Sequence, residues 1–243
     1  MLSEIVQELS RYHRFLIVSH VDPDGDTIGS SLGLAWALRA LGKEVVLACQ
    51  DPVPDEILFL PGVEAYEQQA SGEVDAVVAV DTSDLRRMGT VYDPQTLGAL
   101  PLLVIDHHVT NSGFGTVNLV EEASSTAEIV LKVIDALGVP VDATIATCLL
   151  TAIVTDTQGF RTSSTTLDSL SAAQRLVEAG ARLVEISDQV FNRRPLKMLA
   201  LWGRALAAAQ LREGVVWTEL PLSWLDGINS NGQLGRGLAS MLN

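Results

Sequence analysis

The fold is decided by the stretch Leu102-Leu103-Val104-Ile105-Asp106-His107-His108, in which four aliphatic residues lead into a carboxylate and two imidazoles. A parallel strand buried on both faces is apolar along its whole length, so residues 102–105 predict such a strand. Ligands of open α/β sheets bind just beyond the carboxyl ends of the strands, which is where the polar residues fall. Successive side chains of an extended backbone point to opposite faces, so the two histidines are expected to have different roles.

Other apolar runs of the same kind predict the remaining strands of the sheet. They lie at residues 15–19, 45–49, 75–80 and 116–120. A helix predicted over residues 27–41, closed by Gly42, joins the first two strands, and this strand–helix–strand unit implies a right-handed parallel crossover. The expected fold class is α/β, a parallel, Rossmann-like twisted sheet flanked by helices and followed by a partial second α/β domain.

The other segments are mostly helical in pattern. Ser3 is a candidate N-cap of a helix over residues 3–13, and Ser125-Thr126-Ala127-Glu128 has the form of a capping box at the start of another helix. Further predicted elements are a short helix at 84–88, helices at 143–154 and 169–179, a helical stretch at 185–209 that Pro195 interrupts, a strand at 214–219 and a weak helix at the end of 226–243.

Composition narrows the class of protein. The chain has 243 residues and a net charge of −14, which argues against a surface for extended duplex nucleic acid, because such surfaces use Lys and Arg to neutralise phosphates. No apolar run approaches the roughly 20 residues that cross a membrane, and no signal peptide is evident. Cys49 and Cys148 are expected to be buried free thiols, which favours a cytoplasmic protein.

Eight polar residues follow the predicted strands or a buried helix: His20, Asp24, Asp26, Asp81, Asp106, His107, His108 and Asp156. The ends of parallel strands are neighbours in a sheet, so these side chains can converge. Clustered carboxylates repel one another unless cations lie between them, which predicts metal ions. Oxygen and imidazole ligands suit Mn²⁺ or Mg²⁺, with Zn²⁺, Fe²⁺ or Co²⁺ as alternatives. The ligands suffice for two ions with a bridging carboxylate, an arrangement that promotes displacement at phosphorus.

Each motif also has a purely structural interpretation. Asp22-Pro23-Asp24-Gly25-Asp26 alone is typical of a turn with solvated charges. A His-His pair alone is more often structural or exposed than metal-binding, and an aspartate at a strand end can cap the following helix. Their coincidence at consecutive strand ends favours the metal site.

Four motifs resemble those of the DHH phosphoesterase superfamily. They are Ser19-His20-Val21-Asp22-Pro23-Asp24-Gly25-Asp26, Val80-Asp81-Thr82-Ser83-Asp84, Asp106-His107-His108 and Thr155-Asp156-Thr157. The resemblance spans about residues 1–195. The contexts Leu60-Pro61-Gly62 and Arg86-Arg87-Met88-Gly89 are most similar to the RecJ-like nano-RNase/pAp-phosphatase branch, bacterial proteins that degrade very short oligoribonucleotides.

The resemblance implies a role for each motif residue. The implied metal ligands are His20, Asp24 and Asp81 for one ion and Asp26, Asp81, His107 and Asp156 for the second. Asp81 would then bridge the two ions. His108 would face the scissile phosphate as a charge stabiliser or proton donor, and Asp106 would orient an imidazole. Arg161 and, with less support, Asn111 are candidate phosphate ligands.

Two features depart from the family pattern. Family members often have Gly directly after the Asp-Thr of the fourth motif, where this chain has Gln158 before Gly159. The family's second, DHH-associated domain ends in a Gly-Gly-His motif that grips the substrate, and the chain reaches Asn243 without it. We therefore expect a DHH catalytic domain over residues 1–184, a helical linker over 185–209 and a truncated DHH-associated substrate-binding domain over 210–243.

The expected function is hydrolysis of phosphate esters: short oligoribonucleotides, with 3′-phosphoadenosine 5′-phosphate (PAP) as a second substrate. One alternative is a manganese-dependent inorganic pyrophosphatase, although those enzymes usually carry a basic residue after Asp-His-His, where this chain has Val109. Another is a non-catalytic nucleotide-binding module, but degenerate relatives tend to lose the acidic ligands that this chain retains. The apolar helix at 183–209 makes a homodimer a further expectation.

Overall fold

The computed structural model describes residues 1–193 and 196–224, and the chain divides into two compact units, Met1–Val190 and a second that begins at Phe191. The first unit contains a parallel sheet of β1 (Arg14–Val18), β2 (Glu44–Ala48), β3 (Tyr66–Glu67), β4 (Ala76–Val80), β5 (Leu102–Asp106) and β6 (Val117–Val120). Their order across the sheet is β3-β2-β1-β4-β5-β6, and every neighbouring pair is parallel. The predicted α/β class is confirmed.

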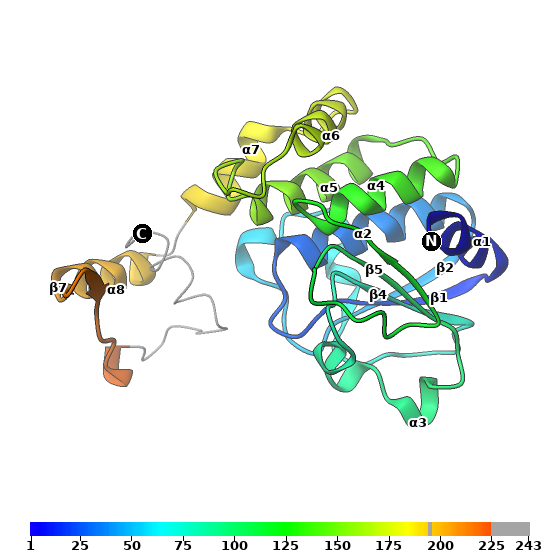
Figure 1. Ribbon diagram of the computed structural model, residues 1–243, viewed down its shortest axis with the longest axis horizontal. Helices are drawn as coiled ribbons and strands as arrows, with labels where there is room; N and C mark the ends of the chain where they lie inside the picture. The colour runs from blue at the N-terminus through cyan, green and yellow to red at the C-terminus, as the bar shows by residue number, and fades with distance from the viewer. Residues whose placement is uncertain (194–195, 225–243) are drawn as a thin grey trace. The chain divides into compact units, whose positions relative to one another are not determined.

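Helices α2 (Gly25–Ala40) and α4 (Thr126–Ala136) pack on one face of this sheet, and α5 (Ala143–Asp156) packs on these two helices, on the same side of the sheet in Figure 1. Along α2, glycines recur every four residues, at 25, 29 and 33. A Cβ atom on Gly29 would lie 2.5 Å from the carbonyl oxygen of Cys148 in α5, and one on Gly25 would lie 2.4 Å from Thr155. Only glycine leaves room for this approach, so the stripe brings α2 and α5 into close contact.

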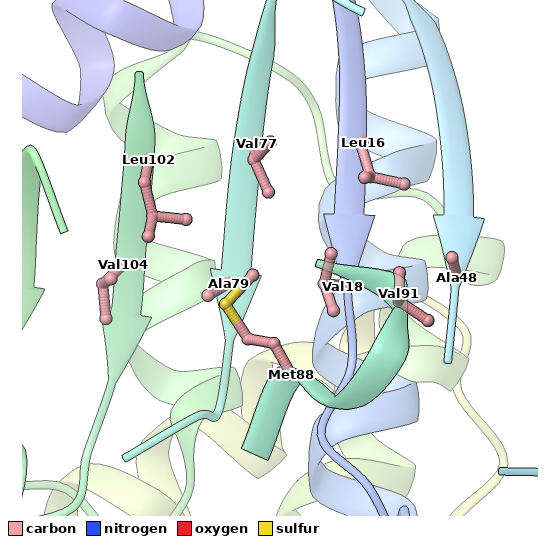
Figure 2. Close-up of a cluster of buried hydrophobic side chains, with 9 residues drawn as sticks. All are labelled: Leu16, Val18, Ala48, Val77, Ala79, Met88, Val91, Leu102 and Val104. Atoms are coloured by element: carbon pink, nitrogen blue, oxygen red, sulfur yellow. The ribbon is translucent and has the colours of Figure 1, made fainter. Parts of the chain in front are cut away.

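The opposite face is covered by the chain that follows β4, which includes η3 (Leu85–Val91) and α3 (Pro94–Leu97). In Figure 2, Met88 and Val91 pack near the carboxyl ends of the strands. The strand side chains of this cluster are Leu16, Val18, Ala48, Val77, Ala79, Leu102 and Val104. Met88 is fully buried, which contributes about 2 kcal/mol to holding η3 in place.

The remaining elements of the first unit are α1 (Leu2–Arg11), η1 (Asp55–Ile57), η2 (Val63–Ala65), α6 (Leu167–Glu178) and α7 (Leu183–Ser187). A π-helical turn, Asp188–Asn192, includes the boundary between the units at Val190. The second unit contains α8 (Leu196–Ala207), an antiparallel hairpin of β7 (Gln210–Arg212) and β8 (Val215–Trp217), and η5 (Leu222–Trp224). In the described part of the chain, no helix is both long enough and apolar enough to cross a membrane.

The structure corrects several local predictions. Helix α1 begins at Leu2, with Met1 as its N-cap, so the predicted Ser3 cap is wrong. Ser125 does cap α4, but the capping box does not close, because the Glu128 carboxylate accepts the backbone N–H of Ser124 at 3.0 Å instead.

Strands β3 and β7 are not predicted from the sequence, because two or three residues show no period. Both cysteines are buried free thiols, as expected. The weak helix predicted within 226–243 lies outside the described residues, and the division into catalytic, linker and substrate-binding domains stays a prediction.

The strand order places a topological switch point between β1 and β4. From β1 the chain continues to β2 and β3 on one side, whereas β4, β5 and β6 lie on the other. Ligands of open α/β sheets bind outside the carboxyl ends of the strands at such a point. The loops after β1 and β4 are therefore the place to look for a site.

Candidate metal centre

The predicted metal ligands lie together beyond the carboxyl ends of the sheet, although they come from distant parts of the sequence. Donor atoms that lie within 4.8 Å of one another belong to three groups: His20, Asp24 and Asp81; Asp26, His107 and Asp156; and Asp81, His107 and His108. We call His20 and Asp24 the β1 side, and His107, Asp26 and Asp156 the β5 side. Asp156 is the last residue of α5 and does not follow that helix as predicted. The roles of these residues as ligands stay a prediction.

Asp81 stands between the two sides. Its Oδ2 lies 3.5 Å from Nε2 of His20, and its Oδ1 lies 3.6 Å from Nε2 of His107. The side chain is buried, and the backbone has a φ of 57°, in the left-handed region that few residues other than glycine, asparagine and aspartate adopt. Backbone strain of this kind is concentrated at functional sites. The arrangement suits a carboxylate that bridges two ions.

The separations between imidazole nitrogens and carboxylate oxygens suit shared cations. Nε2 of His20 is 3.7 Å from Oδ1 of Asp24. Nε2 of His107 is 3.7 Å from Oδ2 of Asp26 and 3.8 Å from Oδ2 of Asp156. Hydrogen bonds are shorter, at about 2.7–3.2 Å, whereas two donors bound to one ion at about 2.0–2.2 Å lie about 3–4 Å apart. The donor set therefore fits divalent cations.

Each imidazole of the site is oriented through its Nδ1. The Nδ1–H groups donate to the carbonyl oxygen of Val21 at 2.8 Å for His20, to that of Ala123 at 3.0 Å for His107, and to Oδ1 of Asp106 at 2.7 Å for His108. A carbonyl oxygen only accepts, so in His20 and His107 the proton is on Nδ1 and Nε2 is left to bind a cation. This is the usual support of a metal-binding histidine.

His108 and Asp106 form a separate hydrogen-bonded unit. Asp106 is fully buried, and its Oδ2 accepts a 2.7 Å hydrogen bond from the amide of Asn111, which also donates to the carbonyl of Thr82 at 3.0 Å. Burial opposes ionisation of Asp106, but the hydrogen bonds from His108 and Asn111 outweigh it and lower the pKa of the carboxyl group. The same bond raises the pKa of His108, whose side chain is 43% exposed. The amide nitrogen of Asn111 is thus used to hold Asp106.

The start of α4 holds the buried carboxylates of Asp26 and Asp81, a contribution that the sequence did not predict. Ser125 Oγ donates to Oδ1 of Asp26 at 2.7 Å, and the backbone N–H of Thr126 donates to its Oδ2 at 2.9 Å. Thr126 Oγ1 donates to Oδ1 of Asp81 at 2.8 Å. The positive end of the helix dipole also favours these charges. The sequence feature that could have indicated this role is the run of three hydroxyl residues at 124–126, because capping of the helix requires only one of them.

Electrostatics at the site follow from burial and from the crowding of charge. Burial, together with the charges of Asp81 and Asp156, raises the pKa of Asp26 well above its usual value. Burial is also the main cause that raises the pKa of Asp156 to about 6. Burial opposes protonation of His20, but Asp24 and Asp81 outweigh it and raise the imidazole pKa to about 9. Bound protons therefore partly neutralise the cluster, and divalent cations would displace them.

Arg161 lies in an exposed loop after α5, where its Nε donates to the carbonyl of Gln158 at 2.8 Å. Three consecutive residues of this loop, Gln158, Gly159 and Phe160, have left-handed φ values of 50°, 72° and 64°. Gln158 stands where the family pattern has glycine, so a strained residue adopts a conformation that glycine adopts freely. A role for Arg161 in phosphate binding stays a prediction.

The fold and the site together define an α/β protein with a metal-type centre at the switch point of a parallel sheet. Residues 14–153 match the DHH family, N-terminal domain. This range is more than half of the chain and includes the first three motifs, with Asp156 just beyond it. The chain belongs to the DHH family.

Three known proteins show the range of similarity. Over 216 residues the chain is 39% identical to the bifunctional oligoribonuclease and PAP phosphatase NrnA of Thermus thermophilus, a match that covers 84% of this chain and 62% of that protein. It is 25% identical to a probable manganese-dependent inorganic pyrophosphatase of Enterococcus faecalis, covering 82% of this chain and 70% of that protein. A crystal structure of an exopolyphosphatase-related protein from Bacteroides fragilis has a TM-score of 0.90 and 25% identity, covering 99% of this chain and 75% of that chain. The chain thus spans less than two thirds of the Thermus relative.

Proposed function

We propose that the chain hydrolyses phosphate esters of short nucleotides, with short oligoribonucleotides and PAP as substrates, in a reaction that uses two divalent metal ions. The observation that carries the proposal is the position of Asp81, whose two oxygens face imidazole nitrogens on opposite sides at 3.5 and 3.6 Å. The name of the 39% identical Thermus relative supports the substrate class. Mn²⁺ is the first choice of ion, because the donor set suits it and a relative is named manganese-dependent; Mg²⁺, Co²⁺, Fe²⁺ and Zn²⁺ are alternatives.

Metal ions bound to these ligands would lower the pKa of a water molecule and neutralise charge that develops on the phosphate. The chain's own residues do the rest. His108, whose pKa is raised by its bond to Asp106, carries a proton for the leaving oxygen. Asp106 fixes the tautomer and the orientation of that imidazole from its buried position at the end of β5.

The test is turnover by the purified chain in the presence of Mn²⁺. We expect release of mononucleotides from di- to pentaribonucleotides and of phosphate from PAP, and we expect Asp81→Ala to reduce both to background. Asp168→Asn is a matched control, because it removes an exposed carboxylate of α6 that belongs to none of the four motifs. Unchanged turnover in Asp81→Ala would contradict the proposal.

A second candidate is a manganese-dependent pyrophosphatase, which the 25% identity to the Enterococcus protein supports. Val109, which is 85% exposed, stands where those enzymes usually have a basic residue. We therefore expect dinucleotide cleavage to exceed phosphate release from pyrophosphate at equal enzyme and Mn²⁺. The reverse order would favour the pyrophosphatase. A chain that binds no metal ion and turns over neither substrate would favour a non-catalytic nucleotide-binding module.

A further inference from the structure

Arg87 lies against the β1 side of the metal centre. Its Nη2 is 2.8 Å from Nδ1 of His20, the ring nitrogen that does not face the carboxylates. In the part of the chain that the structure describes, no carboxylate forms an ion pair with this guanidinium. The sequence singled out Arg87 only as part of a family context, and the proposed reaction has not used it.

The fold fixes the position of Arg87 through its neighbours. Met88 and Val91 are buried against the sheet in Figure 2 and so anchor η3 beside the ends of β1 and β4. The carbonyl oxygen of Arg87 accepts the backbone N–H of Val21 at 2.7 Å, which ties it to the loop after β1. Gly89 has a φ of 59°, and a Cβ there would lie 2.6 Å from Gln50, so the segment packs closely on its surroundings. The half-buried guanidinium is therefore held at the site by the backbone.

Among the described residues, the guanidinium of Arg87 has Nδ1 of His20 as its side-chain neighbour and no oxygen acceptor. Nδ1 of His20 has a second neighbour at 2.8 Å, the carbonyl oxygen of Val21, to which its N–H donates. A guanidinium only donates, so Arg87 then faces another donor. Since no oxygen among the described residues accepts from the guanidinium, its N–H groups can bind an acceptor of a ligand.

The charge of the centre indicates what that acceptor is. The four ligand carboxylates are balanced by two divalent cations, so a bound phosphate adds negative charge that the ligands do not neutralise. A guanidinium presents paired N–H groups that match two phosphate oxygens, and such charge-assisted bonds are among the strongest polar contacts.

We propose that Arg87 binds a phosphate group of the nucleotide substrate next to the β1 side of the metal centre. This inference rests on the proposed function for the class of substrate. It assigns Arg87 to substrate binding. A residue that only packs against His20 would instead affect the affinity of the site for the metal ion. The two roles make different predictions for metal affinity and for phosphate affinity.

The experiment measures both affinities by isothermal titration calorimetry on the full chain. Mn²⁺ is titrated first, and the Mn²⁺-loaded protein is then titrated with AMP and with inorganic phosphate. We expect Arg87→Gln to weaken AMP binding about 10- to 100-fold, because a charge-assisted contact of about 1.5–3 kcal/mol is lost, and to leave Mn²⁺ affinity equal or tighter. Arg87→Lys keeps the charge without the paired donors, so its AMP affinity should lie between that of the wild type and that of Arg87→Gln. Arg86→Gln, an exposed neighbour, is the matched control.

The outcomes separate this inference from the proposed function. Equal AMP affinity in Arg87→Gln and Arg86→Gln overturns the inference, and so does a loss of Mn²⁺ affinity that accounts for the loss of AMP. If Arg87→Gln fails to fold in a thermal melt, Arg87→Lys decides by the same comparison. A wild-type protein that binds AMP through Arg87 but hydrolyses no nucleotide contradicts the proposed function alone, and one that binds neither AMP nor phosphate contradicts both.

Discussion

The two sides of the metal centre are held by different kinds of support. On the β1 side, Asp24 is 36% exposed and caps its own helix, since its Oδ1 accepts the backbone N–H groups of Asp26 at 3.1 Å and Thr27 at 3.3 Å. On the β5 side, Asp26 is 2% exposed and accepts hydrogen bonds from the distant start of α4, through Ser125 and Thr126. One carboxylate is thus positioned locally, and the other is positioned by tertiary contacts.

This difference affects how readily each side takes up a cation. Burial raises the pKa values of both Asp26 and Asp156 on the β5 side, so these groups hold protons more tightly than ordinary carboxyl groups. A cation that enters there must displace protons from these carboxyl groups, and a cation on the β1 side must displace the proton of His20, whose pKa is raised to about 9. The β5 side is the more firmly positioned of the two, and the two sides differ in the kind of group that gives up the proton.

The largest effect is expected from removing one ligand of each side in turn. We expect the wild-type chain to bind about two Mn²⁺ ions and Asp24→Asn and Asp26→Asn to retain about one each, with turnover near background in both. Metal content after dialysis, measured by atomic absorption, checks the prediction. If either variant keeps both ions or loses both, the two sides do not act as separate sites.

A smaller effect is expected from the support of the bridging carboxylate. Thr126→Val removes the hydroxyl that donates to Asp81 at 2.8 Å and keeps a side chain of similar shape. We expect Mn²⁺ affinity to fall about 10- to 100-fold, the usual consequence of losing an outer hydrogen bond to a metal ligand. Thr126→Ser keeps the hydroxyl and should bind nearly as the wild type does; equal affinities in all three proteins would show that α4 does not support the centre.

The raised pKa of Asp156 on the β5 side predicts that the stability of the metal-free protein depends on pH. The folded-state pKa of Asp156 is about 6, above its ordinary value of 3.8, so between these values the folded state binds more protons than the unfolded state. The stabilisation is complete below the ordinary pKa and is lost as pH rises through about 6.

Melting temperatures in a chelator at about pH 5 and about pH 7.5 test this. The wild-type melting temperature should fall with rising pH, and Asp156→Asn should lose part of that fall. Mn²⁺ should restore stability at the higher pH, because it binds the ionised carboxylates of the folded state. Identical pH profiles for both proteins would contradict the assignment of the raised pKa to Asp156.

The smallest effect concerns the strained loop next to the β5 side. Gln158→Gly should stabilise the chain by about 1 kcal/mol, because glycine adopts the φ of 50° without the cost that a side chain imposes there. Gly159→Ala, at a φ of 72°, should destabilise it by a similar amount. Chemical denaturation measures both changes; a Gln158→Gly protein that is less stable would show that the side chain makes contacts worth more than the strain.

Much of the fold could be predicted from the sequence because its strands are short and uniformly apolar. Residues 102–105, for example, are buried on both faces and end at a polar residue, so both the strand and its end could be placed. The candidate ligands could be found for the same reason, since most of them follow a strand or a helix in sequence. The edge strand β3 was missed because it has only two residues.

The supporting residues could not be found in this way, because their roles depend on contacts between distant segments. Ser125 and Asp26 are 99 positions apart, and helix capping alone explains a serine before a helix. In the sequence, Arg87 is part of the family context Arg86-Arg87-Met88-Gly89, and nothing in that context places it beside His20. Its position beside His20 can be inferred only from the structure, in which Met88 is buried against the sheet face opposite the helices.

The glycine stripe of α2 has a consequence for which cation the centre selects. Asp26 belongs to α2 and Asp156 to α5, so the distance between the two helices also sets the width of the β5 side. Gly25 lies against Thr155, next to Asp156, and a Cβ atom there would lie 2.4 Å from the Thr155 side chain, so the two helix ends would have to shift. Since Ca²⁺ binds oxygen at about 2.3–2.6 Å and Mg²⁺ at about 2.0–2.1 Å, a few tenths of an ångström distinguish them. Under the proposed function, we therefore expect substitutions in the stripe to shift the selectivity of the centre toward larger cations.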